Sequence, residues 1–143
     1  MFRVADKKLF DFHMKFACLE RLPFLLGSIG TIFEENNISG DVSLKLQLIL
    51  EEAVSNVIIH GYGKKGGYIA MSAIIKGDIL EIEIRDHAKK FDPMSVSTPD
   101  ITLKPEDRKP GGLGIHMIRK IMDKVVYGYE NGENIILMTK KIK

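Results

Sequence analysis

Residues 50–62 read Leu50-Glu51-Glu52-Ala53-Val54-Ser55-Asn56-Val57-Ile58-Ile59-His60-Gly61-Tyr62, and this stretch decides the fold. A carboxylate, a carboxamide and an imidazole recur in it at intervals of four residues. Positions i, i+4 and i+8 lie on one face of a helix, so Glu52, Asn56 and His60 are expected to form one polar stripe. Because an unpaired buried polar group costs on the order of a few kcal/mol, a shared ligand or metal would explain the stripe.

The composition describes a soluble domain with few special features. A chain of 143 residues with 45% hydrophobic and 28% charged residues can bury a core as a single domain, residues 1–143. The net charge of +2 gives no reason to expect direct nucleic-acid binding or a membrane surface. The single cysteine excludes an intrachain disulfide, and no apolar run is long enough to span a membrane. We therefore expect a cytoplasmic protein.

The hydrophobic periodicity predicts an α+β fold, a two-layer sandwich of helices on one face of a mixed β-sheet. Asp41 or Ser43 is the expected N-cap of the central helix, which Gly61 should end. The expected helices are residues 19–37, 41–60 and 113–124, and the expected strands are residues 7–16, 67–75, 79–86, 125–130 and 135–142. The irregular residues 87–111 are long enough to be a lid over a site.

Glu52 and Asn56 suit metal-assisted phosphoryl chemistry. A carboxylate can orient a hydroxyl group or take its proton. An amide oxygen is a hard ligand for Mg²⁺, which also binds substrate phosphates. On spacing alone, a solvated polar stripe explains these residues more simply.

Two further features favour a nucleotide. Asp86 ends a strand, where its carboxylate can accept a hydrogen bond from an amine such as that of adenine, although an isolated Asp more often forms a turn. Gly111-Gly112-Leu113-Gly114-Ile115 leads into a helix, and glycines together with free N–H groups at a helix start suit phosphate. Each signal is weak alone, but their order along the chain favours a nucleotide site.

These segments resemble the nucleotide-binding domain shared by gyrase, Hsp90, histidine kinases and MutL, the GHKL or Bergerat-fold family. Residues 52–56 match its first box, residues 86–91 its second and residues 112–114 its third. The sequences of residues 52–62 and 112–123 resemble those of the bacterial anti-sigma factor serine/threonine kinases. The resemblance covers about residues 41–143.

By position, the resemblance implies ATP and Mg²⁺ as cofactors. Glu52 would be the general base toward a serine hydroxyl, Asn56 the Mg²⁺ ligand and Asp86 the reader of the adenine amine. Thr139 matches a position that often joins this Asp through water. The other implied ATP contacts are Ala88, Phe91, Gly112, Leu113, Gly114 and Ile115.

Two departures from the family pattern carry expectations. Ala88 stands where the family usually has glycine, so a positive φ there would cost about 1 kcal/mol and weaken nucleotide binding. Lys109 and Pro110 stand where some sporulation-type kinases have arginine, and Arg108 is the nearest replacement for that phosphate clamp.

The resemblance implies an ATP-dependent serine/threonine kinase that acts as an anti-sigma regulatory factor. Its substrate would be an anti-sigma factor antagonist of the STAS fold, phosphorylated on serine, and a homodimer would bind a sigma factor. A non-catalytic module that senses ATP or ADP is the alternative, and an interaction domain without nucleotide is the third reading. The role of His60 stays open beyond support of the helix end.

Overall fold

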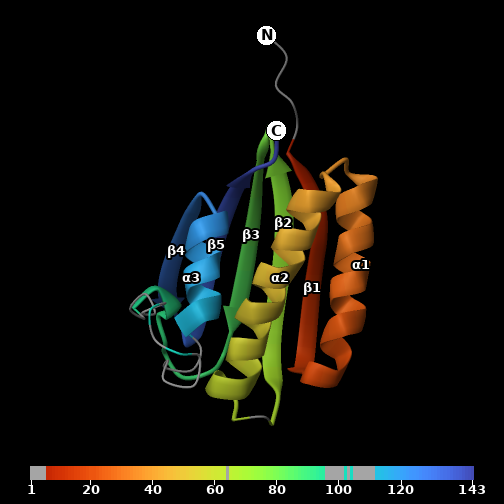
Figure 1. Ribbon diagram of the computed structural model, residues 1–143. Coiled ribbons are helices and arrows are strands. Elements are labelled where there is room, and N and C mark those ends of the chain that lie inside the picture. The colour runs from red at the N-terminus through yellow and green to blue at the C-terminus, as the bar shows by residue number, and fades with distance from the viewer. Residues whose placement is uncertain (1–5, 64, 96–101, 103, 105–111) are drawn as a thin grey trace.

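The computed structural model describes residues 6–63, 65–95, 102, 104 and 112–143, and there five strands form one sheet whose one face is covered by helices (Figure 1). This confirms the predicted α+β sandwich. The helical elements are η1 (Leu19–Arg21), α1 (Leu22–Glu35), α2 (Gly40–Asn56), the π-helical turn η2 (Val57–Gly61), η3 (Pro93–Ser95) and α3 (Gly112–Ile121). The strands are β1 (Lys7–Ala17), β2 (Gly67–Lys76), β3 (Ile79–Asp86), β4 (Lys124–Glu130) and β5 (Glu133–Lys141).

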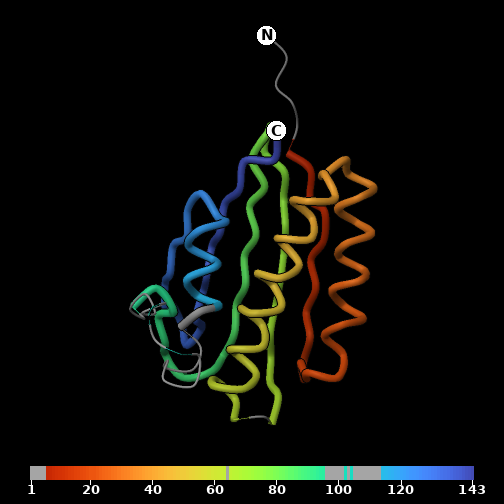
Figure 2. Tube along the Cα trace, in the orientation of Figure 1, coloured from red at the N-terminus to blue at the C-terminus, as the bar shows by residue number. Residues whose placement is uncertain are grey.

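The sheet has the order β1-β2-β3-β5-β4, and each of its four neighbouring pairs is antiparallel. The prediction of a mixed sheet is therefore wrong. The crossover through α3 does make β3 and β4 parallel, but β5 lies between them and pairs with both. The Cα trace shows α3 with the β4–β5 hairpin on one side of α2, and α1 with β1 on the other (Figure 2).

The central helix α2 begins at Gly40, one residue before the predicted range, and its N-cap differs from the prediction. The Ser39 side chain accepts a hydrogen bond from the Val42 N–H at 3.3 Å, so Ser39 is the N-cap in place of Asp41 or Ser43. Ser43 is instead buried, where its hydroxyl accepts from Gln47 at 3.1 Å. At its other end the helix widens into η2, where the Tyr62 N–H reaches the Val57 carbonyl at 3.0 Å.

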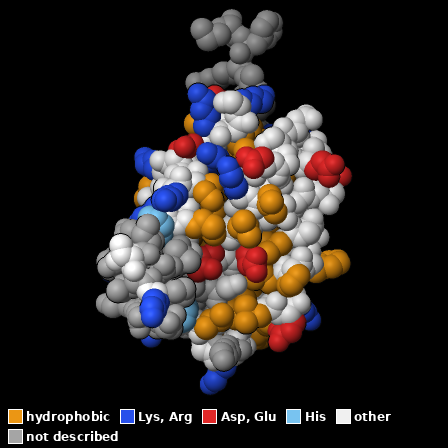
Figure 3. Space-filling view, viewed as in Figure 1, with side chains coloured by type: hydrophobic (Ala, Val, Ile, Leu, Met, Phe, Trp, Pro, Cys, Tyr) orange, Lys and Arg blue, Asp and Glu red, His pale blue; other side chains and the backbone are white. Residues whose placement is uncertain are grey.

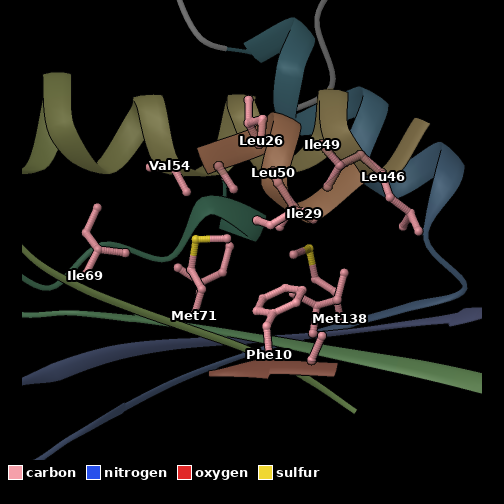
Figure 4. Packing of buried hydrophobic residues seen from close by; sticks show 14 of the residues in the cluster. Phe10, Leu26, Ile29, Leu46, Ile49, Leu50, Val54, Ile69, Met71 and Met138 are labelled. Atoms are coloured by element: carbon pink, nitrogen blue, oxygen red, sulfur yellow. The ribbon is translucent and has the colours of Figure 1, made fainter. Parts of the chain in front are cut away.

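The core lies between α2 and the sheet (Figure 4). Apolar side chains of the helices point toward those of the strands, with Phe10, Leu26, Ile29, Leu46, Ile49, Leu50, Val54, Ile69, Met71 and Met138 labelled there. Along β3 the alternation directs Leu80, Ile82 and Ile84 inward, and all three are buried. The next inward position is Asp86, so the apolar layer ends at this residue with a carboxylate.

Candidate functional site

A cavity of about 410 Å³ opens where the apolar layer ends, a size typical of small-molecule sites. Its wall comes from the end of α2, from η2, from the segment after β3, from α3 and from the β4–β5 hairpin. Most of the wall is apolar. The lining residues are Ala53, Asn56, Val57, His60, Gly61, Asp86, Ala88, Lys89, Phe91, Pro93, Met94, Ile115, Ile118, Val125, Asn134, Ile136 and Met138.

Asp86 and Asn134 form the polar floor of this cavity. They are opposite each other in the β3–β5 register, both buried, and the Asn134 amide donates to Asp86 Oδ1 at 2.9 Å. The Ala88 N–H donates to the same oxygen at 3.0 Å. Because both hydrogen bonds in the described residues fall on one oxygen, the carboxylate keeps acceptor capacity for a ligand.

Burial raises the pKa of the Asp86 carboxyl above its ordinary value. The hydrogen bonds from Asn134 and Ala88 oppose this rise because they favour the charged form, and the field of His87 acts in the same direction. No cation of the described residues forms an ion pair with Asp86. A buried carboxylate of this kind is suited to accept a hydrogen bond from a ligand amine.

Asn134 organises the start of the segment that follows β3. Its amide group also approaches the carbonyls of Ala88 and Lys89, each at 3.1 Å. Its Oδ1 accepts from the Phe91 N–H at 3.0 Å and from the Tyr127 hydroxyl at 2.6 Å. Sequence reasoning missed Asn134, although it is a polar residue at an inward position of an otherwise apolar alternation.

Tyr62 holds the same region from the side of η2. Its hydroxyl donates to the Tyr68 carbonyl at 2.7 Å and accepts from the His87 N–H at 2.8 Å. The residue that follows Asp86 is thereby tied to β2. Nothing in the spacing of the sequence indicated this role, since Tyr62 follows the helix stop at Gly61.

Glu52 lies beside the cavity wall, at the beginning of α3. A side chain added at Gly114 would overlap the Glu52 carboxyl group, so these two residues are in direct contact. The first N–H groups of a helix have no partner within the helix and favour anions. Glu52 therefore lies next to the end of α3 that suits a phosphate.

The predicted polar stripe divides in this arrangement. Asn56 and His60 line the cavity, whereas Glu52 faces Gly114. The π-helical turn from Val57 to Gly61 follows Asn56, and His60 within it still lines the cavity beside Asn56.

Only some of the other predicted residues line the cavity. Ala88, Phe91 and Ile115 line the cavity, while Gly112 and Leu113 begin α3. Contrary to the prediction, Thr139 does not lie beside Asp86. The register of β3 and β5 pairs Thr139 with Glu81 and Asn134 with Asp86. Arg108, Lys109, Pro110 and much of the predicted lid lie outside the described residues.

The expected backbone strain at Ala88 is absent. Among the described non-glycine residues, only Asn37 and Asn131 have a positive φ. Ala88 instead fills space: its methyl group would lie 2.8 Å from a Cβ added at Gly61. The Ala88 methyl group thus occupies space that is left open because Gly61, at the end of η2, has no side chain.

Comparison with known proteins agrees with this geometry. The family model described as a histidine kinase-like ATPase domain matches residues 17–140. The chain belongs to the histidine kinase-like ATPase family. This ATPase domain is 30% identical over 103 residues to an anti-sigma F factor of Clostridium acetobutylicum, with 67% of each chain covered. It is 28% identical over 120 residues to the serine-protein kinase RsbW of Listeria monocytogenes, with 80% of this chain and 76% of that protein covered.

A solved structure supports the fold of the ATPase domain. The SiaB–SiaC complex of Pseudomonas aeruginosa matches with a TM-score of 0.68 and 11% identity over 94% of this chain and 90% of that chain. The resemblance to anti-sigma factor kinases is confirmed by the two relatives above. Within the described residues, every helix is too short or too polar to cross a membrane.

Proposed function

We propose that this chain is an ATP-dependent serine/threonine protein kinase that phosphorylates a STAS-type anti-sigma factor antagonist on serine. One observation carries the proposal: the buried Asp86 carboxylate and helix α3 line the same apolar cavity, and Glu52 contacts the start of that helix. The cavity suits a purine, and the helix start suits its phosphates. The names of the two relatives, anti-sigma F factor and serine-protein kinase, support the same activity.

The roles of the residues follow from their positions. Asp86 would accept the adenine amine, with Asn134 holding its carboxylate. Glu52 would take the proton of the substrate serine as general base, and the N–H groups at Gly112 and Gly114 would meet the phosphates. Ala88, Phe91 and Ile115 would contact the base and the sugar.

Mg²⁺ is part of this proposal, with Asn56 as its protein ligand. The described residues contain no group of three or more His, Cys, Asp or Glu able to hold a metal ion by themselves. This fits Mg²⁺, which keeps several waters and relies on substrate phosphates for the rest of its shell. When bound, the ion would neutralise phosphate charge, and the amide oxygen of Asn56 would orient it.

The partners follow from the same family. We infer a cytoplasmic anti-sigma regulatory factor in which a homodimer binds the sigma factor. β1 is an edge strand of the sheet, and both Phe16 and Phe24 are exposed near it, which supports an association surface at that edge.

The test is phosphoryl transfer from labelled ATP with Mg²⁺ to STAS-domain proteins of the same genome, with the modified residue identified by mass spectrometry. We expect one phosphoserine. Nucleotide binding without transfer to any of them would favour the alternative, an ATP- or ADP-sensing module. A melting temperature unmoved by saturating ATP and Mg²⁺ would exclude both functions.

Two substitutions separate binding from chemistry. Glu52→Gln should keep ATP binding and lose transfer, because it removes only the proton acceptor. Asn56→Ala should lose Mg²⁺-dependent ATP binding. Intact transfer by Glu52→Gln would contradict the assignment of the general base.

A further inference from the structure

Helix α2 carries two exposed leucines on the side away from the core. Leu44 is 60% exposed and Leu48 is 43% exposed, while Leu46, Ile49 and Leu50 between and beside them are fully buried. Leu44 and Leu48 are one turn apart and lie on one face. An amphipathic helix normally presents polar residues on that face, so packing within this chain does not explain these two leucines.

The same line of the helix leads to Glu52. Successive steps of four residues connect Leu44, Leu48 and Glu52, and each step is about 6 Å along the axis. The apolar surface therefore begins one turn from the carboxyl group that contacts Gly114. The space-filling view shows hydrophobic side chains gathered over the helices, with acidic side chains next to them (Figure 3).

Charged residues border this surface. Asp41 and Lys45 form an ion pair at 3.2 Å beside Leu44. Glu51 is exposed next to Leu48, and it has no ion-pair partner among the described residues. An apolar centre with a polar border is the usual anatomy of a protein interface.

We propose that Leu44 and Leu48 form the docking surface for the protein substrate, which places its serine at Glu52. This inference rests on the proposed kinase function. The occupant is the antagonist protein, which presents an apolar patch to the leucines and a basic group to Glu51. The distance from this patch to its serine matches the one to two helical turns that separate Leu48 and Leu44 from Glu52. Docking site and base share one helix, and such a rigid arrangement fixes the distance between the anchor and the reacting hydroxyl.

The test compares Leu44→Gln/Leu48→Gln with a matched control, Val126→Gln. Val126 is 45% exposed on β4, which is remote from α2, so the control removes a similar exposed apolar group elsewhere. Glutamine is uncharged and helix-compatible, so it leaves the field at Glu52 unchanged. The substrate is the STAS-domain protein that the unaltered chain phosphorylates in the screen above. The single variants are measured as well, so that misfolding of the double variant still leaves a result.

We expect the KM for the protein substrate to rise about tenfold or more in the double variant, with kcat and the KM for ATP within about twofold. Glu51→Gln should raise the same KM by a smaller factor. An unchanged KM, or an equal rise in Val126→Gln, would overturn the docking surface while the kinase function stands. A lower mass of the double variant by light scattering would assign the leucines to a second copy of this chain and also overturn it. Absence of transfer by the unaltered chain would be a failure of the proposed function itself, visible before any variant is made.

Discussion

The two faces of the sheet differ at neighbouring positions of β3 and β5. On the inner face, Asp86 and Asn134 are buried and joined by one hydrogen bond at the floor of the cavity. On the outer face, the preceding residues Arg85 and Glu133 form a solvent-accessible ion pair at 3.3 Å. His87 and Glu83 extend this outer network through contacts at 3.0 and 2.5 Å.

The number of ionic contacts on a face does not indicate how sensitive that face is to substitution. The outer face has more ionic contacts, but water screens them and makes each worth little. The inner face has one carboxylate, and removal from water makes each of its hydrogen bonds expensive to lose. We therefore place function and sensitivity to substitution on the inner face, and the predictions below test that contrast.

The largest effect is expected for Asn134→Ala. It removes one of two donors to Asp86 and leaves the Phe91 N–H and the Tyr127 hydroxyl without their acceptor. The loss of the buried Asn134–Asp86 hydrogen bond, together with these two partly buried ones, should lower the free energy of unfolding by about 2–4 kcal/mol. Urea unfolding measures this loss, and the ATP-induced rise in melting temperature should vanish with it. A loss below about 1 kcal/mol would show that the floor of the cavity is not the organising centre.

Asp86→Asn should weaken ATP binding by at least about tenfold without destabilising the free protein. An asparagine oxygen can still accept from Ala88 and Asn134, but its charge is gone. Calorimetric titration with ATP and Mg²⁺ measures the affinity. Retained affinity would remove Asp86 from the adenine contact.

The same variant also has a pH signature. The folded-state pKa of Asp86 is raised, so its contribution to stability is present at low pH and lost as the pH rises through that folded pKa. Asp86→Asn removes this loss. The unliganded variant should then gain stability relative to the unaltered chain as the pH rises from 4 to 7, as followed by melting temperature; a relative loss over this range would contradict the sign.

Gly61→Ala tests how tightly the inner face is packed. The new methyl group would lie 2.8 Å from the Ala88 Cβ, and such overpacking typically costs about 1–3 kcal/mol. Ala88→Gly should rescue most of this cost. A double-mutant cycle of unfolding free energies measures the coupling, and additive effects would mean that the two residues do not compete for space.

The smallest effect is expected on the outer face. Glu133→Gln removes the negative charge that pairs with Arg85 and His87, yet exposed pairs contribute at most about 1 kcal/mol. Its affinity for ATP should stay within about twofold of the unaltered chain. A larger change in calorimetric titration would show that the outer network acts on the cavity. It would contradict the placement of function on the inner face alone.

The sequence predicted the residues of local elements better than their partners. Asp86 was found because it ends a strongly alternating strand, and Glu52 and Asn56 because helical spacing is a local property. The prediction for Thr139 was wrong because pairing of β3 with β5 depends on a register between residues far apart in the chain. Asn134 was missed for the same reason.

The mixed sheet was predicted from the periodicity and order of the helices and strands along the chain, and this order does not state which strands pair. The insertion of β5 between β3 and β4 is set by tertiary packing and cannot be predicted from a local sequence pattern. The N-cap at Ser39 was missed because Asp41 and Ser43 offered equally suitable capping side chains. The strain expected at Ala88 depended on a backbone angle that only the structure gives.

The contact between Glu52 and Gly114 has an evolutionary consequence. The atoms that a side chain at position 114 would meet are the flexible end of Glu52, so the fold can absorb the change by moving the carboxyl group. Selection at position 114 would then act on the placement of one proton acceptor and hardly on folding. A chain without Glu52 would have room for a side chain at position 114, so we expect the identities of residues 52 and 114 to change together.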